Sequence, residues 1–68
     1  MITQIGLVAG DIWHYLDKHG EVKFDDLLKG VEKERDIVLM SLGWLAREGH
    51  VIVGNDKSGR LVKLRKEQ

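Results

Sequence analysis

Apolar residues near the amino terminus recur at the spacing of one face of an α-helix. They occupy positions i, i+3, i+4, i+7 and i+11, at Ile5, Val8, Ala9, Ile12 and Leu16. This spacing predicts an amphipathic helix over roughly residues 3–19. Thr3 can cap its start, and Gly20 is the residue type that commonly ends a helix in a left-handed conformation. The carboxyl end is better signalled than the start, because Gly6 and Gly10 each disfavour helix by about 1 kcal/mol relative to Ala.

After this predicted helix, the spacing between apolar residues changes. Residues 21–24 alternate polar and apolar side chains, which predicts a short, half-buried strand. Asp25 or Asp26 is expected to cap a short second helix, and Gly30 is expected to limit its length. The apolar residues of that helix are Leu27, Leu28 and Val31. A polar segment, residues 32–35, separates the second helix from a third.

The third helix is the most apolar of the chain and is predicted from this polar segment to Glu48, where Gly49 stops it. Two helices joined by a short turn, with the second the longer, form a helix-turn-helix pattern. Residues 51–53 and 61–64 then have strong β-propensity, and the turn-forming or charged residues 54–60 lie between them. The sequence therefore predicts an α+β fold, mainly α, that ends in a β-hairpin with a long polar tip.

This order of elements, together with one segment of the third helix, resembles a known protein family. The resemblance rests on residues 42–51, LGWLAREGHV, with Ile12-Trp13 and Tyr15-Leu16 upstream. The chain is similar over nearly its whole length to stand-alone prokaryotic winged helix-turn-helix proteins of unknown function. The resemblance implies three helices, a small antiparallel sheet with a carboxy-terminal wing, a DNA-binding type of superfamily and a dimer. It implies no activity.

Length and composition narrow the class of protein further. A chain of 68 residues is expected to be one domain over residues 1–68, near the lower size limit for burying a core without metal or disulfide. A partner subunit would therefore add buried area that so short a chain lacks. The chain has no Cys, which excludes disulfides and makes a reducing cytoplasm the expected compartment. It shows no secretion signal and no apolar run near the ~20 residues that span a bilayer, so no membrane partner is expected.

Charge is balanced overall but unevenly distributed. Eleven basic and eleven acidic residues cancel, which is not typical of a dedicated nucleic-acid binder. Residues 1–53 carry six Lys/Arg and nine Asp/Glu, whereas residues 54–68 carry five and two. The surplus positive charge therefore lies in the hairpin and the segment after it.

A basic wing can contact phosphates and position a protein on DNA without reading the base sequence. The candidate nucleic-acid-binding residues lie in the hairpin and near the two ends of the third helix: Lys33, Arg35, Arg47, Lys57, Arg60 and Lys63. Arg65 and Lys66 follow them. Glu34 and Asp36 flank Arg35 and would repel phosphates. A solvated loop and a basic tail explain the same charges without DNA, and that alternative stays open.

The third helix is apolar on the side that would read DNA. In a winged helix this helix normally presents polar and basic side chains to the major groove. Here Val38, Leu42 and Leu45 are expected to face the core, yet the opposite side is also apolar, and a helix that is hydrophobic all round is usually buried all round. The candidate interface residues are Leu39, Met40, Gly43 and Trp44. The alternative is that the first helix or the wing covers Trp44 as part of the core.

The first helix has a second distinctive stripe, formed by Gly6, Gly10 and Trp13 beside its core face. Small residues four positions apart permit close helix packing. Contact within the chain, with the third helix or the hairpin, is the expected explanation.

No set of residues has the spacing of a catalytic or metal site. The three histidines are not spaced as metal ligands, and no Cys accompanies them. Asp25 and Asp26 are better explained as residues at a helix amino terminus than as a catalytic acid–base pair. Residues 54–59 precede a strand rather than a helix, so they do not form a phosphate-binding loop. We therefore expect that the protein is not an enzyme and that it binds no cofactor and no small-molecule substrate.

Two functions from different classes remain open. The first is a homodimeric module of the transcription-regulator type that contacts double-stranded DNA through its wing and the start of the third helix. The second is a protein-interaction module in which the Trp44 face binds a protein and DNA is never bound. Zero net charge and the apolar outer face favour the second, whereas analogy of fold favours the first.

Overall fold

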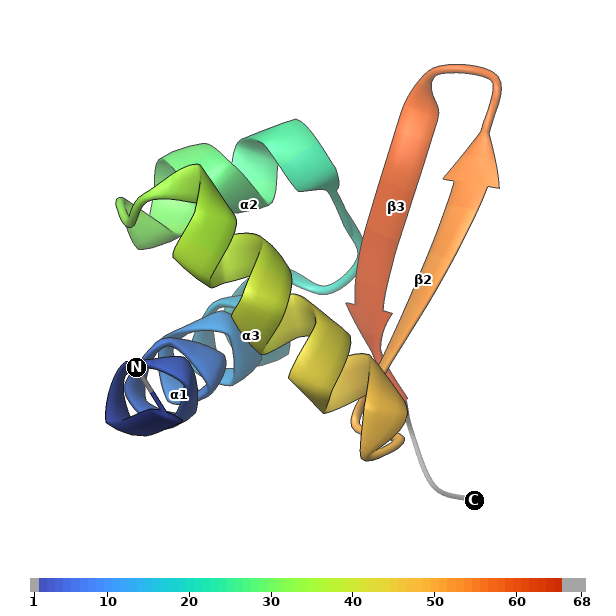
Figure 1. Cartoon of the computed structure of the whole chain (residues 1–68). Coiled ribbons are helices and arrows are strands. Elements are labelled where there is room, and N and C mark those ends of the chain that lie inside the picture. Colours follow the sequence, from blue (N-terminus) through green and yellow to red (C-terminus); the bar gives the residue numbers. More distant parts are fainter. Residues whose placement is uncertain (1, 66–68) are drawn as a thin grey trace.

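Three helices pack beside a small antiparallel sheet in the computed structural model, which describes residues 2–65 (Figure 1). The elements are α1 (Ile2–His19), β1 (Val22–Lys23), α2 (Phe24–Val31), α3 (Arg35–Arg47), β2 (Val51–Asp56) and β3 (Gly59–Leu64). The β2–β3 hairpin projects past the helices as a wing (Figure 1). This arrangement confirms the predicted α+β winged helix-turn-helix architecture.

The sheet has the order β1-β3-β2, so β3 lies at its centre. Val22 of β1 pairs with Val62, and β2 pairs with β3 from Val51 opposite Leu64 to Asp56 opposite Gly59. Because successive side chains of a strand point to opposite faces, the buried residues Val62 and Leu64 define the helix-facing side of β3.

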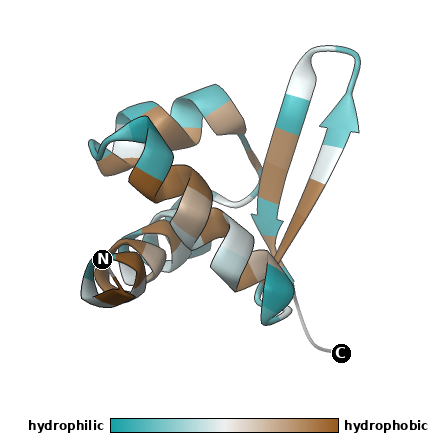
Figure 2. Cartoon of the chain, viewed as in Figure 1, coloured by the Kyte–Doolittle hydropathy of each residue, from teal (hydrophilic) through white to brown (hydrophobic). Residues whose placement is uncertain are grey.

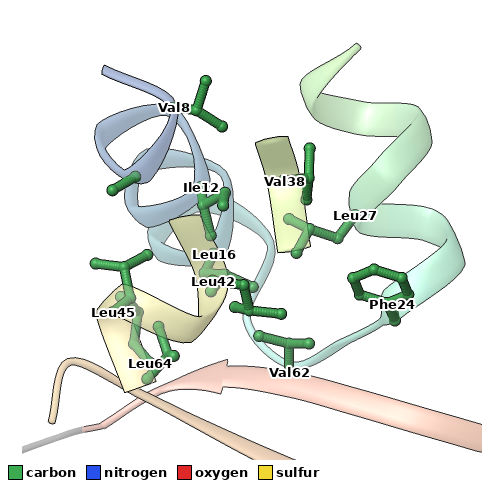
Figure 3. Packing of buried hydrophobic residues seen from close by; sticks show 12 residues of the cluster. Val8, Ile12, Leu16, Phe24, Leu27, Val38, Leu42, Leu45, Val62 and Leu64 are labelled. Atoms are coloured by element: carbon green, nitrogen blue, oxygen red, sulfur yellow. The ribbon is translucent and has the colours of Figure 1, made fainter. Parts of the chain in front are cut away.

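The core fills the space between the three helices and this side of the sheet (Figure 3). Figure 3 shows side chains from α1, α2, α3 and β3 pointing toward one another. The buried apolar residues are Val8, Ala9, Ile12, Leu16, Phe24, Leu27, Val38, Leu42, Leu45, Val51, Val62 and Leu64. The predicted core faces of the first and third helices are therefore confirmed, with Ile5 only partly buried.

The start of α2 differs from the prediction. Phe24 is buried and is the first residue of α2 rather than the last of a strand, so the helix begins before the aspartate pair. Lys23 occupies the N-cap position, and no side chain of residues 2–65 caps the helix. The predicted cap at Asp25 or Asp26 is wrong. Both carboxylates lie instead in the first turn, where the helix dipole favours them.

The ends of the other helices follow the glycine signals in part. Gly20 and Gly49 have φ values of 75° and 79°, the left-handed conformation predicted for residues that end helices. Thr3 lies inside α1, which starts at Ile2. Gly30 does not end α2, because the helix continues to Val31 and the left-handed residue is Glu32, with φ 56°.

The tip of the wing is shorter than predicted. The strands run to Asp56 and resume at Gly59, which leaves Lys57 and Ser58 in the turn. The Asp56 Oδ1 atom accepts hydrogen bonds of 2.8 Å from both the backbone N–H and the hydroxyl of Ser58. Such local bonds stabilise a tight turn, so most residues that composition assigned to the loop form strands. Hydrophilic residues still cover the tip, as Figure 2 shows.

This turn makes the wing sensitive to acid. Hydrogen bonds from the Ser58 hydroxyl and then from its backbone N–H hold the pKa of Asp56 below its ordinary value. Because the folded pKa is depressed, the stabilisation is present above the unfolded pKa of about 3.9 and is lost as pH falls through the folded pKa. We expect NMR titration of the Asp56 carboxyl carbon to give a midpoint below about 3.9 that rises in Ser58→Ala. A midpoint that Ser58→Ala leaves unchanged would contradict this assignment.

Ser41 is a polar residue in the contact between α3 and the rest of the core. It is fully buried, and its hydroxyl has no hydrogen-bond partner within residues 2–65. An unsatisfied buried hydroxyl costs about 1–3 kcal/mol, so we expect Ser41→Ala to raise the free energy of unfolding by about 1 kcal/mol. Urea denaturation measures the change. A lower stability would mean that the hydroxyl has a partner in solution.

Candidate nucleic-acid interface

A hollow of about 330 Å³ lies between the start of α2, the start of α3 and the wing. Three cationic residues from three different elements line it: Lys23 at the N-cap of α2, Arg35 at the first position of α3, and Arg60 of β3. One carboxylate, Asp25, and the amide of Asn55 also line it. We call this site the basic hollow.

Local structure explains how Arg35 and Arg60 reach the same place. Arg60 precedes Val62 by two residues, so the strand pleat puts it on the helix-facing side of β3. The Arg35 guanidinium carbon lies 5.3 Å from the centroid of the Phe24 ring, and Phe24 is anchored in the core. A cation–π contact of this kind contributes about 0.5–1 kcal/mol at an exposed site. It holds Arg35 beside the hollow.

The other predicted nucleic-acid residues are spread over the molecule. Lys57 is exposed in the turn of the wing. Lys63 is exposed and lies on the outer face of β3, because it falls between the inward-facing Val62 and Leu64. Arg47 ends α3, about 18 Å from Arg35 at 1.5 Å per residue. Lys66 lies outside the described residues.

Lys33 belongs to a different surface. It lines a hollow between α1, the segment joining α2 to α3, and the start of α3. The same hollow carries four carboxylates, from Asp11, Glu32, Glu34 and Asp36. Their charge opposes an approaching phosphate. Of the six predicted residues, Arg35 and Arg60 therefore meet in one site, and Lys23 joins them although its place in the sequence did not mark it.

The predicted interface residues of the third helix fall on two of its sides. At about 100° per residue, Leu39 projects toward the same side as Arg35, whereas Met40 and Trp44 project away from it. Gly43 lies between these directions and is exposed. Trp44 is 47% exposed, so neither α1 nor the wing buries it in the single chain.

The expected explanation for the glycine stripe of α1 is wrong. A Cβ atom added at Gly6 or Gly10 would meet no atom of residues 2–65 within 4 Å, so these glycines do not serve a close contact within the chain. Trp13 from the same stripe lines a surface groove together with Trp44. The two predicted apolar surfaces, one on each helix, therefore meet at a single place.

Residues 2–65 offer neither a metal cluster nor a membrane-spanning helix. In that part of the chain, no three His, Asp or Glu side chains are placed to hold a metal ion together. None of its helices combines the length and the apolar character needed to cross a membrane.

A helix-turn-helix formed by α2 and α3, followed by a β-hairpin wing, defines the class of winged helix-turn-helix proteins. The chain belongs to the family described as Winged helix-turn-helix domain (DUF2582), whose model matches residues 1–64. This membership confirms the resemblance found in the sequence. Winged-helix domains are typical of DNA binding and are typically non-enzymatic.

Two known proteins are similar to this chain. The chain is 38% identical over 68 residues to the uncharacterized protein MJ1608 of Methanocaldococcus jannaschii, with 96% of each protein covered. Its fold is similar to the solution NMR structure of protein BT2368 from Bacteroides thetaiotaomicron, with a TM-score of 0.80 and 24% identity, over 91% of this chain and 76% of that one. The first relative supports the family, and the second supports the fold alone.

Proposed function

We propose that residues 1–68 form a single cytoplasmic module of the transcription-regulator type that binds double-stranded DNA as a homodimer. The observation that carries the proposal is the convergence of Lys23, Arg35 and Arg60 in the basic hollow. The wing and the first turn of the second helix of a helix-turn-helix lie where a winged helix meets the DNA backbone.

The hollow is suited to phosphate oxygens in two respects. Its three cations can each neutralise a phosphate and release condensed counterions. In addition, no side chain of residues 2–65 caps the start of α2, so its first-turn backbone N–H groups remain as donors for anions. In the first turn of α3 the Ile37 N–H already donates a hydrogen bond to Asp36 Oδ1. Asp25 and Asp36 reduce the net positive charge, which limits affinity to the moderate range.

The side of α3 that faces the wing offers little direct base readout. Beyond Arg35 it carries Leu39 and Ala46, and Leu39 is 39% exposed. Apolar side chains contact thymine methyl groups but donate no hydrogen bonds to base edges. Phosphate contacts therefore dominate, and these position a protein without specifying sequence. We propose weakly specific DNA binding rather than stringent operator recognition.

Fluorescence anisotropy of a labelled random-sequence duplex tests this proposal. We expect a Kd of about 10⁻⁴ to 10⁻⁶ M at physiological salt, and a slope of log K against log salt of about −2.7 per subunit for three phosphates. Absence of binding at low salt, or binding that does not depend on salt, would contradict the proposal.

A protein-interaction module is the second candidate function. The observation that favours it is the exposed Trp44 on a chain whose net charge is zero. In that case the Trp44 face binds another protein and the basic hollow stays empty of DNA. Under either candidate we propose no catalytic role, cofactor, small-molecule substrate or membrane partner.

A further inference from the structure

Both tryptophans of the chain line one groove on the surface between α1 and α3. Trp13 comes from α1 and Trp44 from α3, and Gly6 and Gly10 also line the groove, whose volume is about 250 Å³. The two indole side chains are 38% and 47% exposed. We call this feature the tryptophan groove.

The glycines leave an open notch in one side of α1. They lie one helical turn apart, and a Cβ atom at either position would meet no atom of residues 2–65 within 4 Å. Glycine at such a position lets another backbone approach closely. Ile2 lies one turn before Gly6 and is 86% exposed, so the same side of α1 carries both a notch and a large apolar side chain.

The residues that line the groove include no Asp, Glu, Lys or Arg. About one residue in three of the chain is charged, yet residues 1–10 and 37–46 contain no Asp, Glu, Lys or Arg. These two stretches include the amino-terminal half of α1 and most of α3, and the two helices pack against each other. Of the exposed large apolar side chains of the two helices, Trp13 and Trp44 line the groove. Leu7 and Met40 instead line the hollow that carries the four carboxylates.

We propose that a second copy of this chain docks on the tryptophan groove, with α1 against α1 of its partner about a twofold axis. An isologous interface must be complementary to itself, and the groove supplies both the glycine notch and the two indole rings, with no Asp, Glu, Lys or Arg in its lining to meet a like charge. Two copies with zero net charge also have no long-range repulsion to overcome. A charged partner finds no ion pair in the groove.

A dimer of ordinary size would cover a substantial part of the surface of this chain. A stable interface buries about 800 Å² on each partner, which is about one sixth of the 4968 Å² surface of the described chain. Exposed aromatic side chains such as Trp13 and Trp44 are typical of interface cores. The proposal extends the α3 interface predicted from the sequence to α1, and it leaves Leu39 and Gly43 outside.

The tryptophan groove and the basic hollow do not compete for space on α3. Arg35 and Trp44 are nine residues apart, which places them about 180° from each other around the helix at 100° per residue. A dimer formed through the groove therefore leaves both basic hollows free. The proposed interface has only the homodimer in common with the proposed function, and it does not depend on DNA binding.

Sedimentation equilibrium of the full chain without DNA tests the proposal, with Gly10→Ala as the principal variant. We expect the wild type to form a dimer and Gly10→Ala to raise the dimer Kd at least tenfold, because the added methyl group fills the notch. In dilute solution the same variant should have a higher melting temperature than the wild type, since Ala favours helix over Gly. Loss of association together with gain of fold stability separates an interface role from misfolding.

Two matched controls complete the experiment. Gly43→Ala makes the same exchange in an open position of α3 outside the groove, and Ile52→Arg changes a similarly exposed apolar residue on the edge strand β2. Neither should change the dimer Kd. The proposal is overturned if the wild type stays monomeric up to 0.5 mM, which would leave the groove to a different protein. It is also overturned if Gly10→Ala associates normally or if Ile52→Arg abolishes the dimer.

Discussion

The double variant Arg35→Glu with Arg60→Glu is expected to bind random-sequence DNA about 100-fold more weakly than the wild type at 50 mM salt. Both side chains line the basic hollow, and each phosphate contact contributes about 0.9 to the salt slope, or roughly tenfold in affinity at this salt. The slope should fall in magnitude by about 1.8. Fluorescence anisotropy across a salt series measures both quantities.

A control with the same change of charge distinguishes the hollow from general electrostatics. Lys63→Glu with Arg65→Glu alters two exposed residues, of which Lys63 lies on the outer face of the sheet. Because Lys63 points to the opposite face of β3 from Arg60, it cannot contact a phosphate that is held in the hollow. This variant should therefore lose much less affinity and keep most of its salt slope. Equal losses in the two double variants would mean that the hollow is not the DNA site.

Gly30→Ala is expected to lower the free energy of unfolding by about 1–2 kcal/mol, or the melting temperature by roughly 4–16 °C. A Cβ atom at Gly30 would overlap the ring of Tyr15 on α1, and Tyr15 packs against the core. Ala favours helix by up to about 1 kcal/mol, but displacing the ring outweighs this gain. Thermal and urea denaturation report the change.

Gly43→Ala provides the opposite result for the same substitution. Gly43 lies inside α3, and a Cβ atom there would meet nothing within 4 Å in residues 2–65. Helix propensity alone then applies, so this variant should be more stable by up to about 1 kcal/mol. If both variants shift stability in the same direction, contact between Gly30 and Tyr15 is not what sets the sign.

Most of the fold could be predicted from apolar spacing because burial is periodic in α1 and α3. The turn of the wing could not, because Asn55, Asp56 and Arg60 have the composition of a loop. They are tolerated in strands since their side chains are exposed and the Asp56–Ser58 hydrogen bonds close the turn locally. The aspartate cap also failed, because burial of Phe24 draws that residue into the helix.

The basic hollow was only partly predictable. Arg35 and Arg60 were selected by charge and position, whereas Lys23 lines the hollow from the N-cap of α2. The pairing of β1 with β3 sets Lys23 opposite Leu61, on the other face of the sheet from Arg60. Such non-local pairing leaves no mark near Lys23 in the sequence. The outward orientation of Lys63 could have been predicted from the sequence, since this residue lies between two apolar strand residues that face the core.

The tryptophan groove depended on tertiary structure for the same reason. The sequence marked Trp44 on one helix and the Gly6, Gly10 and Trp13 stripe on another. Only the crossing of α1 and α3 shows that the two surfaces are one.

Amide NMR titration of the labelled protein with a random-sequence duplex at low salt tests DNA binding through the basic hollow most directly. We predict salt-reversible shifts at Lys23, around Arg35 and at residues 57–60, with none at Gly6 or Gly10. Shifts confined to α1 and Trp44, or no shifts at saturating DNA, would contradict DNA binding through the basic hollow.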